Sequence, residues 1–217
     1  MPTRPPAPAH AFGNLLAGAF VMPIIRIELR ASAVPLARAL VAGGVRVFEV
    51  LLRTPCALDA IADIRAQVPE ATVGAGTLLG AADVANALAA GAQFAVTPGL
   101  TAELAHAVLR HQLPTLPGVA TASEVMQAMA LGFDALKLFP AHGLWGASQI
   151  EALQGVFPSL RFCPTGGIKP EHIATYLALR GCGGVGGSWV TPDRLIAQGD
   201  WAGITALARQ AAGFRRL

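Results

Sequence analysis

The chain has 217 residues, three cysteines and a formal net charge of +3. So small a charge, with no basic run and no cluster of basic and aromatic residues, argues against a nucleic-acid partner. The cysteines, Cys56, Cys163 and Cys182, are too scattered for a disulfide framework or a zinc site, so a reducing cytoplasm is the expected location. Mean hydropathy is high at +0.52, but no run is long and clean enough to span a membrane. The composition instead suits a parallel sheet covered by helices.

The N-terminal region divides into two parts. Its first ten residues, "MPTRPPAPAH", form a proline-rich tail that need not fold. The apolar segment that follows, residues 11–25, is composed like a signal peptide. Pro23 interrupts it, however, and Arg26 and Glu28 follow at once, so we expect a short helix that leads into a first strand. The expected organisation is a flexible tail at residues 1–10 and one domain at residues 11–217.

Short apolar runs recur along the rest of the chain, separated by alanine- and leucine-rich segments with helical periodicity. Eight of these runs are expected to form strands: Val21–Ile27, Val45–Leu51, Ala71–Ala75, Ala92–Thr97, Pro114–Pro117, Ala135–Phe139, Arg161–Pro164 and Gly183–Gly186. Helix starts are indicated by Thr101, by Thr121 with Glu124 as a capping box, and by Pro170. Eight strand–helix units with short connections predict a single-domain α/β fold, a closed (β/α)₈ TIM barrel with a short N-terminal helix.

The stretch "FDALKLFP", residues 133–140, carries a lysine inside an expected strand, in a chain with only two lysines and 14 arginines. Strand alternation directs Lys137 into the barrel, at the carboxyl end where TIM barrels hold their active sites. The same alternation in the second strand directs Glu49 inward. Burial lowers the pKa of an amine and so frees it as a nucleophile, whereas an arginine stays protonated. A neighbouring carboxylate opposes that shift, and the two residues by themselves fit a structural ion pair equally well.

Two glycine-rich stretches follow the seventh and eighth expected strands, where TIM barrels often bind a phosphate. They read "PTGG", from Pro164 to Gly167, and "GVGGSW", from Gly184 to Trp189. Glycines let backbone N–H groups approach an anion, and Ser188 adds a hydroxyl at the start of the last helix. Either stretch alone is a weak signal, because glycine pairs also form simple turns. Together they predict a phosphate site.

Two further polar residues are expected at strand ends. Arg53, in "LLRT", has the same parity as Glu49 and lies just past the second strand, where it is the natural clamp for a substrate carboxylate. "GAGT", residues 74–77, is not a dinucleotide fingerprint, because Leu79 stands where the third glycine would be. We interpret it as a tight turn that presents the Thr77 hydroxyl.

Seven motifs together carry a family resemblance: "VAGGVRVFEVLLRT", "VGAGT", "FAVTPGL", "LPGVATASE", "ALKLFPA", "RFCPTGGI" and "GGVGGSWV". In order and spacing they resemble the bacterial 2-keto-3-deoxy-6-phosphogluconate (KDPG) and 4-hydroxy-2-oxoglutarate aldolases. The resemblance covers nearly the whole chain after the tail. It implies a class I aldolase, a homotrimer of (β/α)₈ barrels that cleaves the phosphorylated keto acid KDPG to pyruvate and D-glyceraldehyde 3-phosphate in the Entner–Doudoroff pathway, without a metal or cofactor.

The resemblance also assigns residues. Lys137 matches the Schiff-base lysine and Glu49 the acid/base. The matches around the pyruvyl carboxylate and carbonyl are Arg53, Thr77, Pro98 and Phe139. The matches at the distal hydroxyl and phosphate are Thr165, Gly166, Gly167, Gly187 and Ser188. The sequence departs from the family pattern at the mouth of the site, with Leu51 in place of a threonine, and with His142 and Trp145 in place of smaller or acidic residues.

Two other interpretations stay open. One is a related aldolase that acts on the galactonate epimer of the phosphate ester or on 4-hydroxy-2-oxoglutarate, although Thr165 and the "GGSW" loop favour the gluconate form. The other is a phosphate-binding barrel without Schiff-base chemistry, in which Lys137 and Glu49 are a structural pair. Among the other residues, we expect Cys163 to be a small buried residue. We expect Lys169 to be a solvated residue at a helix start, with phosphate attraction as the less favoured alternative.

Overall fold

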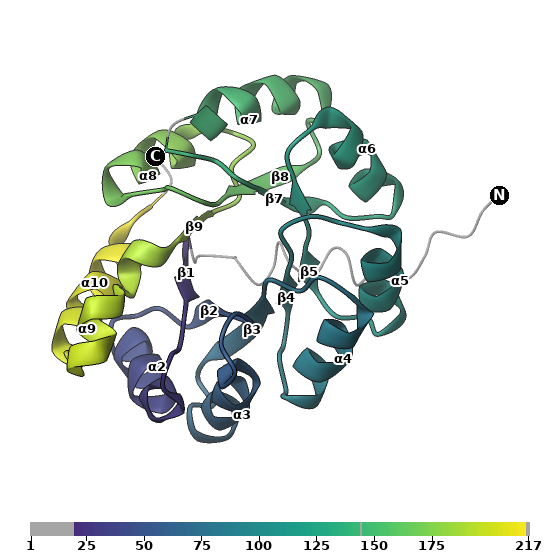
Figure 1. Cartoon of the computed structure of the whole chain (residues 1–217). Helices are drawn as coiled ribbons and strands as arrows, with labels where there is room; N and C mark the ends of the chain where they lie inside the picture. Colours follow the sequence, from purple (N-terminus) through teal and green to yellow (C-terminus); the bar gives the residue numbers. More distant parts are fainter. Residues whose placement is uncertain (1–19, 144, 216–217) are drawn as a thin grey trace.

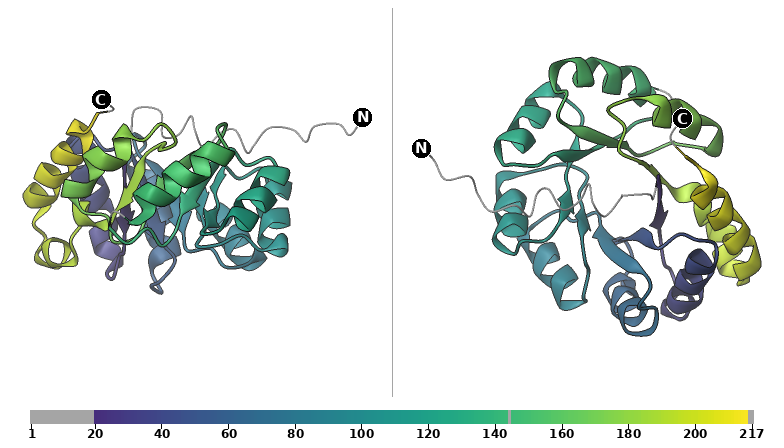
Figure 2. Two further views of the ribbon diagram at one scale, coloured as in Figure 1. Left: turned by 90° about the horizontal axis from the view of Figure 1, so that it is seen from above. Right: turned by 180° about the vertical axis from the view of Figure 1, so that it is seen from behind.

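The computed structural model describes residues 20–143 and 145–215 of the chain. Figure 1 shows the strands gathered at the centre of the molecule with helices arranged around them. Figure 2 gives the same arrangement from above and from behind. This is the expected α/β architecture, in which helices cover the outer side of parallel strands. The expected tail at residues 1–10 and the short helix expected ahead of the first strand lie outside the described residues.

Strands and helices alternate along the described part of the chain. The strands are β1 (Val21–Ile25), β2 (Val47–Leu51), β3 (Thr72–Gly76), β4 (Ala95–Val96), β5 (Thr115–Leu116), β6 (Gly118–Val119), β7 (Ala135–Leu138), β8 (Arg161–Pro164) and β9 (Val185–Gly187). The α-helices are α2 (Ala33–Ala42), α3 (Ala57–Gln67), α4 (Ala81–Ala89), α5 (Ala102–Arg110), α6 (Ala122–Ala130), α7 (Trp145–Val156), α8 (Pro170–Ala178), α9 (Asp193–Gln198) and α10 (Trp201–Gly213). Two short 3₁₀ helices, η1 (Arg30–Ser32) and η2 (Ser188–Val190), complete the set.

The predicted helix starts are confirmed. The Thr101 hydroxyl accepts a hydrogen bond from the Leu104 backbone N–H at the start of α5. At the start of α6, Thr121 and Glu124 form the expected capping box, in which each side chain accepts from the other residue's backbone N–H. Such caps satisfy N–H groups that have no partner within the helix.

Strand pairing is parallel throughout the described sheets and defines a six-stranded sheet, in the order β5-β4-β3-β2-β1-β9, and a three-stranded sheet, in the order β6-β7-β8. Two isolated parallel bridges, Phe162 with Cys182 and Thr165 with Gly186, connect β8 and its carboxyl end to the segment around β9. Parallel order places the carboxyl ends of all these strands on one side of the molecule. The candidate site residues are therefore brought to the same side.

The prediction of a single strand at Pro114–Pro117 needs correction. The segment forms two short strands: β5 pairs with β4, and β6 pairs with β7. Pro117, between them, has no N–H group to donate to a neighbouring strand. Its carbonyl instead accepts from the backbone N–H of Lys137. The chain therefore changes its hydrogen-bonding partner from β4 to β7 at this proline.

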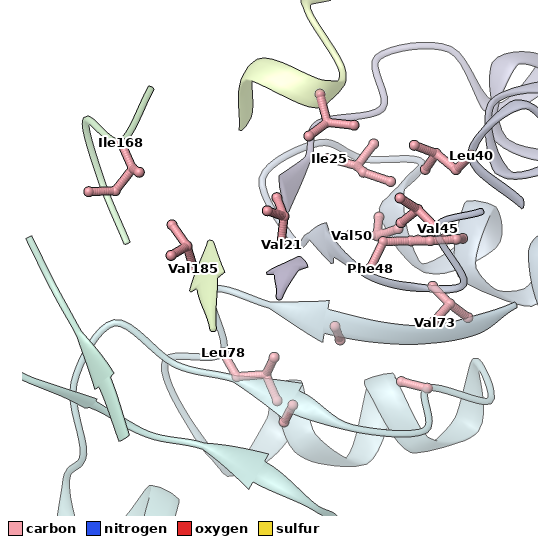
Figure 3. Close-up of a cluster of buried hydrophobic side chains, with 14 of the residues drawn as sticks. Val21, Ile25, Leu40, Val45, Phe48, Val50, Val73, Leu78, Ile168 and Val185 are labelled. Atoms are coloured by element: carbon pink, nitrogen blue, oxygen red, sulfur yellow. The ribbon is translucent and has the colours of Figure 1, made fainter. Parts of the chain in front are cut away.

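The core consists of two buried clusters, one on each side of the strands. In the larger one, Phe48 and Val50 of β2 pack with Leu40 of α2, and Figure 3 shows these side chains together with Ile25. The smaller cluster lies on the other side of the strands and contains Met22, Phe94, Val96, Leu116, Ala135 and Cys163. Alternate strand residues thus contribute to opposite faces. Among the described helices, none has the length and apolar character needed to cross a membrane.

Candidate active site

Lys137 of β7 and Glu49 of β2 lie side by side in the interior of the strand assembly. Both are on the face that carries the smaller cluster, since Ala135 precedes Lys137 by two residues and Val47 precedes Glu49 by two. Lys137 is 5% exposed and Glu49 is 0% exposed. The distance from Lys137 Nζ to Glu49 Oε1 is 3.9 Å. The sequence prediction that β2 and β7 direct these two side chains toward one another is confirmed.

The Glu49 carboxyl group occupies an apolar and confined position. Neither of its oxygens has a hydrogen-bond partner among the described residues. Burial raises the pKa of Glu49 above its usual range, and the charges of Lys137 and Arg53 oppose that shift without reversing it. A raised pKa makes Glu49 a better proton acceptor than an ordinary carboxylate, as a general base requires.

A ring and a thiol complete the surroundings of Lys137. Its Nζ lies 5.0 Å from the centroid of the Phe139 ring, on the same face of the chain two residues further along. Cys163 of β8 pairs with Lys137 in the register of the strands and is 1% exposed. Burial raises the pKa of the Cys163 thiol to about 12. Cys163 is therefore a small buried residue, as expected, and not a thiolate.

Arg53 and Thr77 form a second polar pair, beyond the carboxyl ends of β2 and β3. The Arg53 Nε–H donates to the Thr77 hydroxyl at 3.0 Å. Thr77 has a φ of 66°, in a region that β-branched residues rarely adopt. The tight turn expected at "GAGT" is wrong, because Gly74, Ala75 and Gly76 belong to strand β3. The chain leaves the strand only at Thr77, whose hydroxyl is nevertheless presented as expected and accepts from Arg53.

The two glycine-rich stretches lie next to each other. The bridge between Thr165 and Gly186 joins them. Gly166 and Gly167 have φ angles of 98° and 73°, a backbone conformation that side chains disfavour. Ser188 is exposed and begins the 3₁₀ helix η2. The expectation that Ser188 begins the last helix is wrong, because η2 and α9 both precede α10.

These elements surround a cavity of about 380 Å³. Its charged, polar and glycine residues are Arg53, Lys137, Thr165, Gly166, Gly167, Lys169, Gly186 and Ser188. Its apolar residues are Ile24, Leu51, Phe139, Ile168 and Trp189. Within the described part of the chain, no aspartate or glutamate lines the cavity, so its walls favour an anionic ligand.

Four of the predicted site residues lie outside the cavity lining but next to it. Glu49 lies behind Lys137, and Thr77 contacts Arg53. The backbone of Pro98 packs against Gly118, because a Cβ atom at Gly118 would lie 2.3 Å from the Pro98 carbonyl carbon. Gly118 in turn pairs with Lys137. Gly187 is the residue before Ser188, in β9.

Sequence reasoning missed part of the cavity wall. Lys169 lines the cavity, although a solvated position at a helix start was the favoured interpretation and phosphate attraction the less favoured one. It is indeed exposed, and its backbone N–H donates to His172 Nδ1 at 3.2 Å at the start of α8. The signal available in the sequence was its position two residues after Gly167. Trp189 and Ile168 were missed because neither residue type indicates a ligand.

The loop after β7 packs against the glycine turn. The Tyr176 hydroxyl of α8 donates to the backbone carbonyl of Gly143. A Cβ atom at Gly167 would lie 3.2 Å from the Gly143 backbone nitrogen, so the two backbones are in close contact. His142 has a positive φ of 41°, and Trp145 is 72% exposed at the start of α7. Neither lines the cavity. The His142 backbone does pack against the glycine turn, because a Cβ atom at Gly167 would lie 3.2 Å from the His142 Cα.

The chain is similar to characterised proteins over most of its length. Residues 13–207 match the family model described as "Aldolase: KDPG and KHG aldolase". The chain is 49% identical over 191 residues to the KHG/KDPG aldolase of Escherichia coli strain K12, a match that covers 88% of this chain and 90% of the relative.

Two solved structures extend the similarity to the fold. The KDPG aldolase of Zymomonas mobilis ZM4 with 3-phosphoglycerate has a TM-score of 0.89 at 46% identity, covering 96% of this chain and 98% of that one. The KDPG aldolase of Legionella pneumophila, with pyruvate captured as a covalent carbinolamine intermediate, has a TM-score of 0.87 at 40% identity, covering 94% and 97%. By sequence and by fold, this chain belongs to the KDPG and KHG aldolase family.

Proposed function

We propose that the protein is a class I aldolase, a lyase that cleaves KDPG to pyruvate and D-glyceraldehyde 3-phosphate in the Entner–Doudoroff pathway. The observation that carries the proposal is the buried pair of Lys137 and Glu49, 3.9 Å apart beside an anion-favouring cavity. The family membership supports it, because relatives that are 44 to 48% identical are named 2-dehydro-3-deoxy-phosphogluconate aldolase.

Lys137 is the proposed nucleophile. Its neutral amine adds to the C2 carbonyl of the substrate to form a carbinolamine, and loss of water then gives an iminium ion. The iminium accepts the electrons of the C3–C4 bond when that bond breaks. Because the iminium is itself the electron sink, this reaction needs neither a metal nor a cofactor.

Glu49 is the proposed acid and base. Its carboxylate takes the proton of the C4 hydroxyl, the C3–C4 bond breaks, and the aldehyde leaves an enamine on Lys137. The protonated Glu49 then returns the proton to C3, and water hydrolyses the resulting imine to release pyruvate and the free amine. The raised pKa of Glu49 suits both directions of this transfer.

Binding groups lie at both ends of the proposed substrate chain. At the pyruvyl end, Arg53 holds the carboxylate in an orientation set by Thr77, and Phe139 and Pro98 shape the surroundings of the carbonyl. At the distal end, the residues proposed to bind the hydroxyl and the phosphate are Thr165, Gly166, Gly167, Gly187 and Ser188. The glycine turn and the start of η2 suit this role, since Gly166, Gly167 and Ser188 line the cavity and glycine-rich turns let backbone N–H groups approach an anion.

The proposal extends to architecture and assembly. We infer that the two sheets form one closed (β/α)₈ barrel, with β5 and β6 as halves of a single strand. The bridges between β8 and the β9 segment, and the pairing of β9 with β1, support closure. A homotrimer in the cytoplasm is proposed from the family resemblance, and the three free cysteines suit a reducing compartment. Light scattering on the purified protein tests the trimer.

A second candidate substrate is 4-hydroxy-2-oxoglutarate. The observation that favours it is the 49% identical relative from Escherichia coli, whose name includes both KHG and KDPG. Both compounds are 2-keto-4-hydroxy acids, so the same Lys137 and Glu49 chemistry cleaves either of them. Comparison of kcat/KM for the two substrates, and for the galactonate epimer of KDPG, ranks these activities.

Borohydride trapping with pyruvate tests the mechanism. The expected result is one reduced pyruvyl adduct per chain, found by intact mass and assigned to Lys137 by peptide mapping. Because the chain has only two lysines, Lys169 in the same sample is an internal control for nonspecific reductive alkylation. Lys137→Ala should form no adduct. A folded wild-type protein without an adduct would overturn the Schiff-base mechanism.

A further inference from the structure

We propose that Lys169 binds the phosphate group of the substrate and makes this protein selective for phosphorylated keto acids over their unphosphorylated analogues. The inference rests on the function proposed above and concerns a residue that none of the family motifs contains. The chain has two lysines, and both of them line the same cavity.

The position of Lys169 separates it from the covalent chemistry. Lys137 is 5% exposed and lies beside Glu49, in the interior. Lys169 is exposed and is the N-cap residue just before α8, two residues after Gly167 of the glycine turn. The bridge between Thr165 and Gly186 brings this turn beside the segment that leads to Ser188. The second amine is thus at the end of the cavity where the distal group of the substrate is proposed to bind.

The charges around the cavity support a role in anion binding. No acidic side chain lines the cavity among the described residues, and Lys169 forms no salt bridge with any of them. Its charge is therefore not neutralised by a neighbouring carboxylate. Arg53, the other exposed cation of the lining, is held by Thr77 at the carboxyl end of β2. A cation at each end of the cavity matches a substrate with a carboxylate at one end and a phosphate at the other.

A nearby arginine is the strongest competitor for this role, and it is less suitable. Arg26 lines a neighbouring cavity of about 260 Å³ that shares Ile24, Leu51 and Ser188 with the first. Its guanidinium is paired with Glu28 at 2.5 Å. A phosphate bound there would have to displace that carboxylate or bind beside it. No carboxylate of the described residues is paired with Lys169, so a phosphate could bind it without displacing one.

The Lys169 ammonium group adds a net positive charge, which the glycine turn and the Ser188 hydroxyl lack. Backbone N–H groups and the Ser188 hydroxyl recognise phosphate oxygens by hydrogen bonding, but they carry no net charge. A phosphate monoester carries nearly two negative charges at pH 7, since its second pKa is about 6. Lys169, as a flexible point charge on a long stem, can follow the phosphate while the turn fixes its orientation. Because Lys169 is exposed, salt should weaken its contribution.

The test compares two substrates that differ only in the phosphate: KDPG and 2-keto-3-deoxygluconate, in which a hydroxyl replaces it. Steady-state kcat/KM is measured for both substrates with wild-type protein, Lys169→Met and Lys169→Arg. The methionine retains the apolar stem and removes the charge, while the helix start keeps its backbone bond to His172. The ratio of kcat/KM for KDPG to that for the analogue should fall about fivefold in Lys169→Met, as expected for one solvent-exposed charge contact.

Three further measurements assign that loss to a local charge. Arg110→Met removes one exposed positive charge from the end of α5, which precedes β5 and so lies on the face opposite the cavity, and it should keep the wild-type ratio. Lys169→Arg should restore most of the ratio. Addition of 0.5 M salt should lower the ratio in wild-type protein and change it much less in Lys169→Met.

The outcomes separate the two proposals. Wild-type protein that forms the pyruvyl adduct, together with an unchanged ratio in Lys169→Met, would overturn the role of Lys169 and leave the aldolase mechanism intact. An equal fall in Lys169→Met and Arg110→Met would also overturn it, because the effect would then be one of net charge. No adduct in the wild-type protein would overturn the proposed function and, with it, this role.

Discussion

A Cβ atom on Gly76 would lie 2.1 Å from Oε1 of Glu49 and 2.5 Å from its Cγ. Gly76 ends β3 and pairs with Leu51 at the end of β2, so it lies directly beside the strand that carries the acid. The missing side chain creates the space that the carboxyl group occupies. The position of the proposed acid/base therefore depends on a glycine in the neighbouring strand.

Replacing Gly76 by alanine should move Glu49 away from Lys137. The added methyl overlaps three atoms of the Glu49 side chain, so the whole carboxyl group must shift. We expect kcat for KDPG cleavage to fall about 100-fold, within the range for loss of a positioned acid or base. Overpacking should also cost about 1–3 kcal/mol in the free energy of unfolding.

Gly80→Ala is the matched control for that experiment. A Cβ atom on Gly80 meets nothing within 4 Å, and its φ of −158° is accessible to any residue. Its kcat should stay within about twofold of the wild-type value, a change that corresponds to a few tenths of a kcal/mol in the activation barrier. If Gly76→Ala behaves like Gly80→Ala, the carboxyl group has no role in catalysis that depends on its position.

Glu49 should make the protein less stable as pH rises. Its folded-state pKa is raised above the reference value of 4.5, chiefly by burial. Below pH 4.5 the carboxyl is protonated in both states, and its contribution to stability is fully present. As pH rises through the folded pKa, this contribution is lost. Urea unfolding from pH 4 to pH 8 should therefore show wild-type protein losing stability relative to Glu49→Gln.

The contribution of Glu124 to stability should change with pH in the opposite direction to that of Glu49. Its pKa is lowered, mainly by the hydrogen bond from the Ala120 backbone N–H, and also by Thr121. A lowered pKa stabilises the folded state above pH 4.5, and this stabilisation is lost as pH falls. Relative to Glu124→Gln, wild-type protein should therefore gain stability as pH rises. Two difference curves with the same slope would contradict the assignment of Glu49 as a buried acid.

The Thr77 hydroxyl should matter for binding of the pyruvyl carboxylate. Thr77→Val removes the acceptor of the Arg53 Nε–H but keeps the volume and the β-branched shape. We expect KM for KDPG to rise about fivefold, which corresponds to about 1 kcal/mol, the typical net contribution of one hydrogen bond. Since valine and threonine are equally strained at a φ of 66°, backbone strain does not differ between them.

Thr77→Ser distinguishes the hydroxyl from the methyl group. Serine keeps the hydroxyl that accepts from Arg53, so its KM should stay near the wild-type value. Substrate KM is measured for all three proteins at the same ionic strength, because the carboxylate contact is electrostatic. A KM that rises equally in Thr77→Ser and Thr77→Val would show that the hydroxyl does not orient the guanidinium.

The parts of the site that follow from strand alternation could be predicted from the sequence, and those that depend on contacts between loops could not. Alternation placed Lys137 and Glu49 on one face because side-chain direction has a fixed period of two. The double role of the segment around Pro117 was not visible, since it depends on which neighbours the strand pairs with. The solvated helix start predicted for Lys169 is confirmed. Its place in the cavity wall was not visible in the sequence, because only the position of α8 brings it there.

The Tyr176 hydroxyl is expected to position the phosphate end of the site without touching the substrate. It donates to the Gly143 carbonyl, and the Gly143 backbone packs against Gly167. Tyr176→Phe removes this link between α8 and the loop after β7. We expect KM for KDPG to rise about threefold and the free energy of unfolding to fall by about 1 kcal/mol, as for one lost hydrogen bond.

Thr205→Val separates these two effects of Tyr176→Phe. The Thr205 hydroxyl donates to backbone carbonyls of Ala39 and Trp201, between α10 and α2 and outside the cavity lining. Its loss should lower stability by a similar amount and leave KM for KDPG unchanged. The ratio of kcat/KM for KDPG to that for 2-keto-3-deoxygluconate gives the decisive reading. A ratio that falls in Tyr176→Phe but not in Thr205→Val assigns Tyr176 to the phosphate end, whereas equal ratios would mean that its hydroxyl serves stability alone.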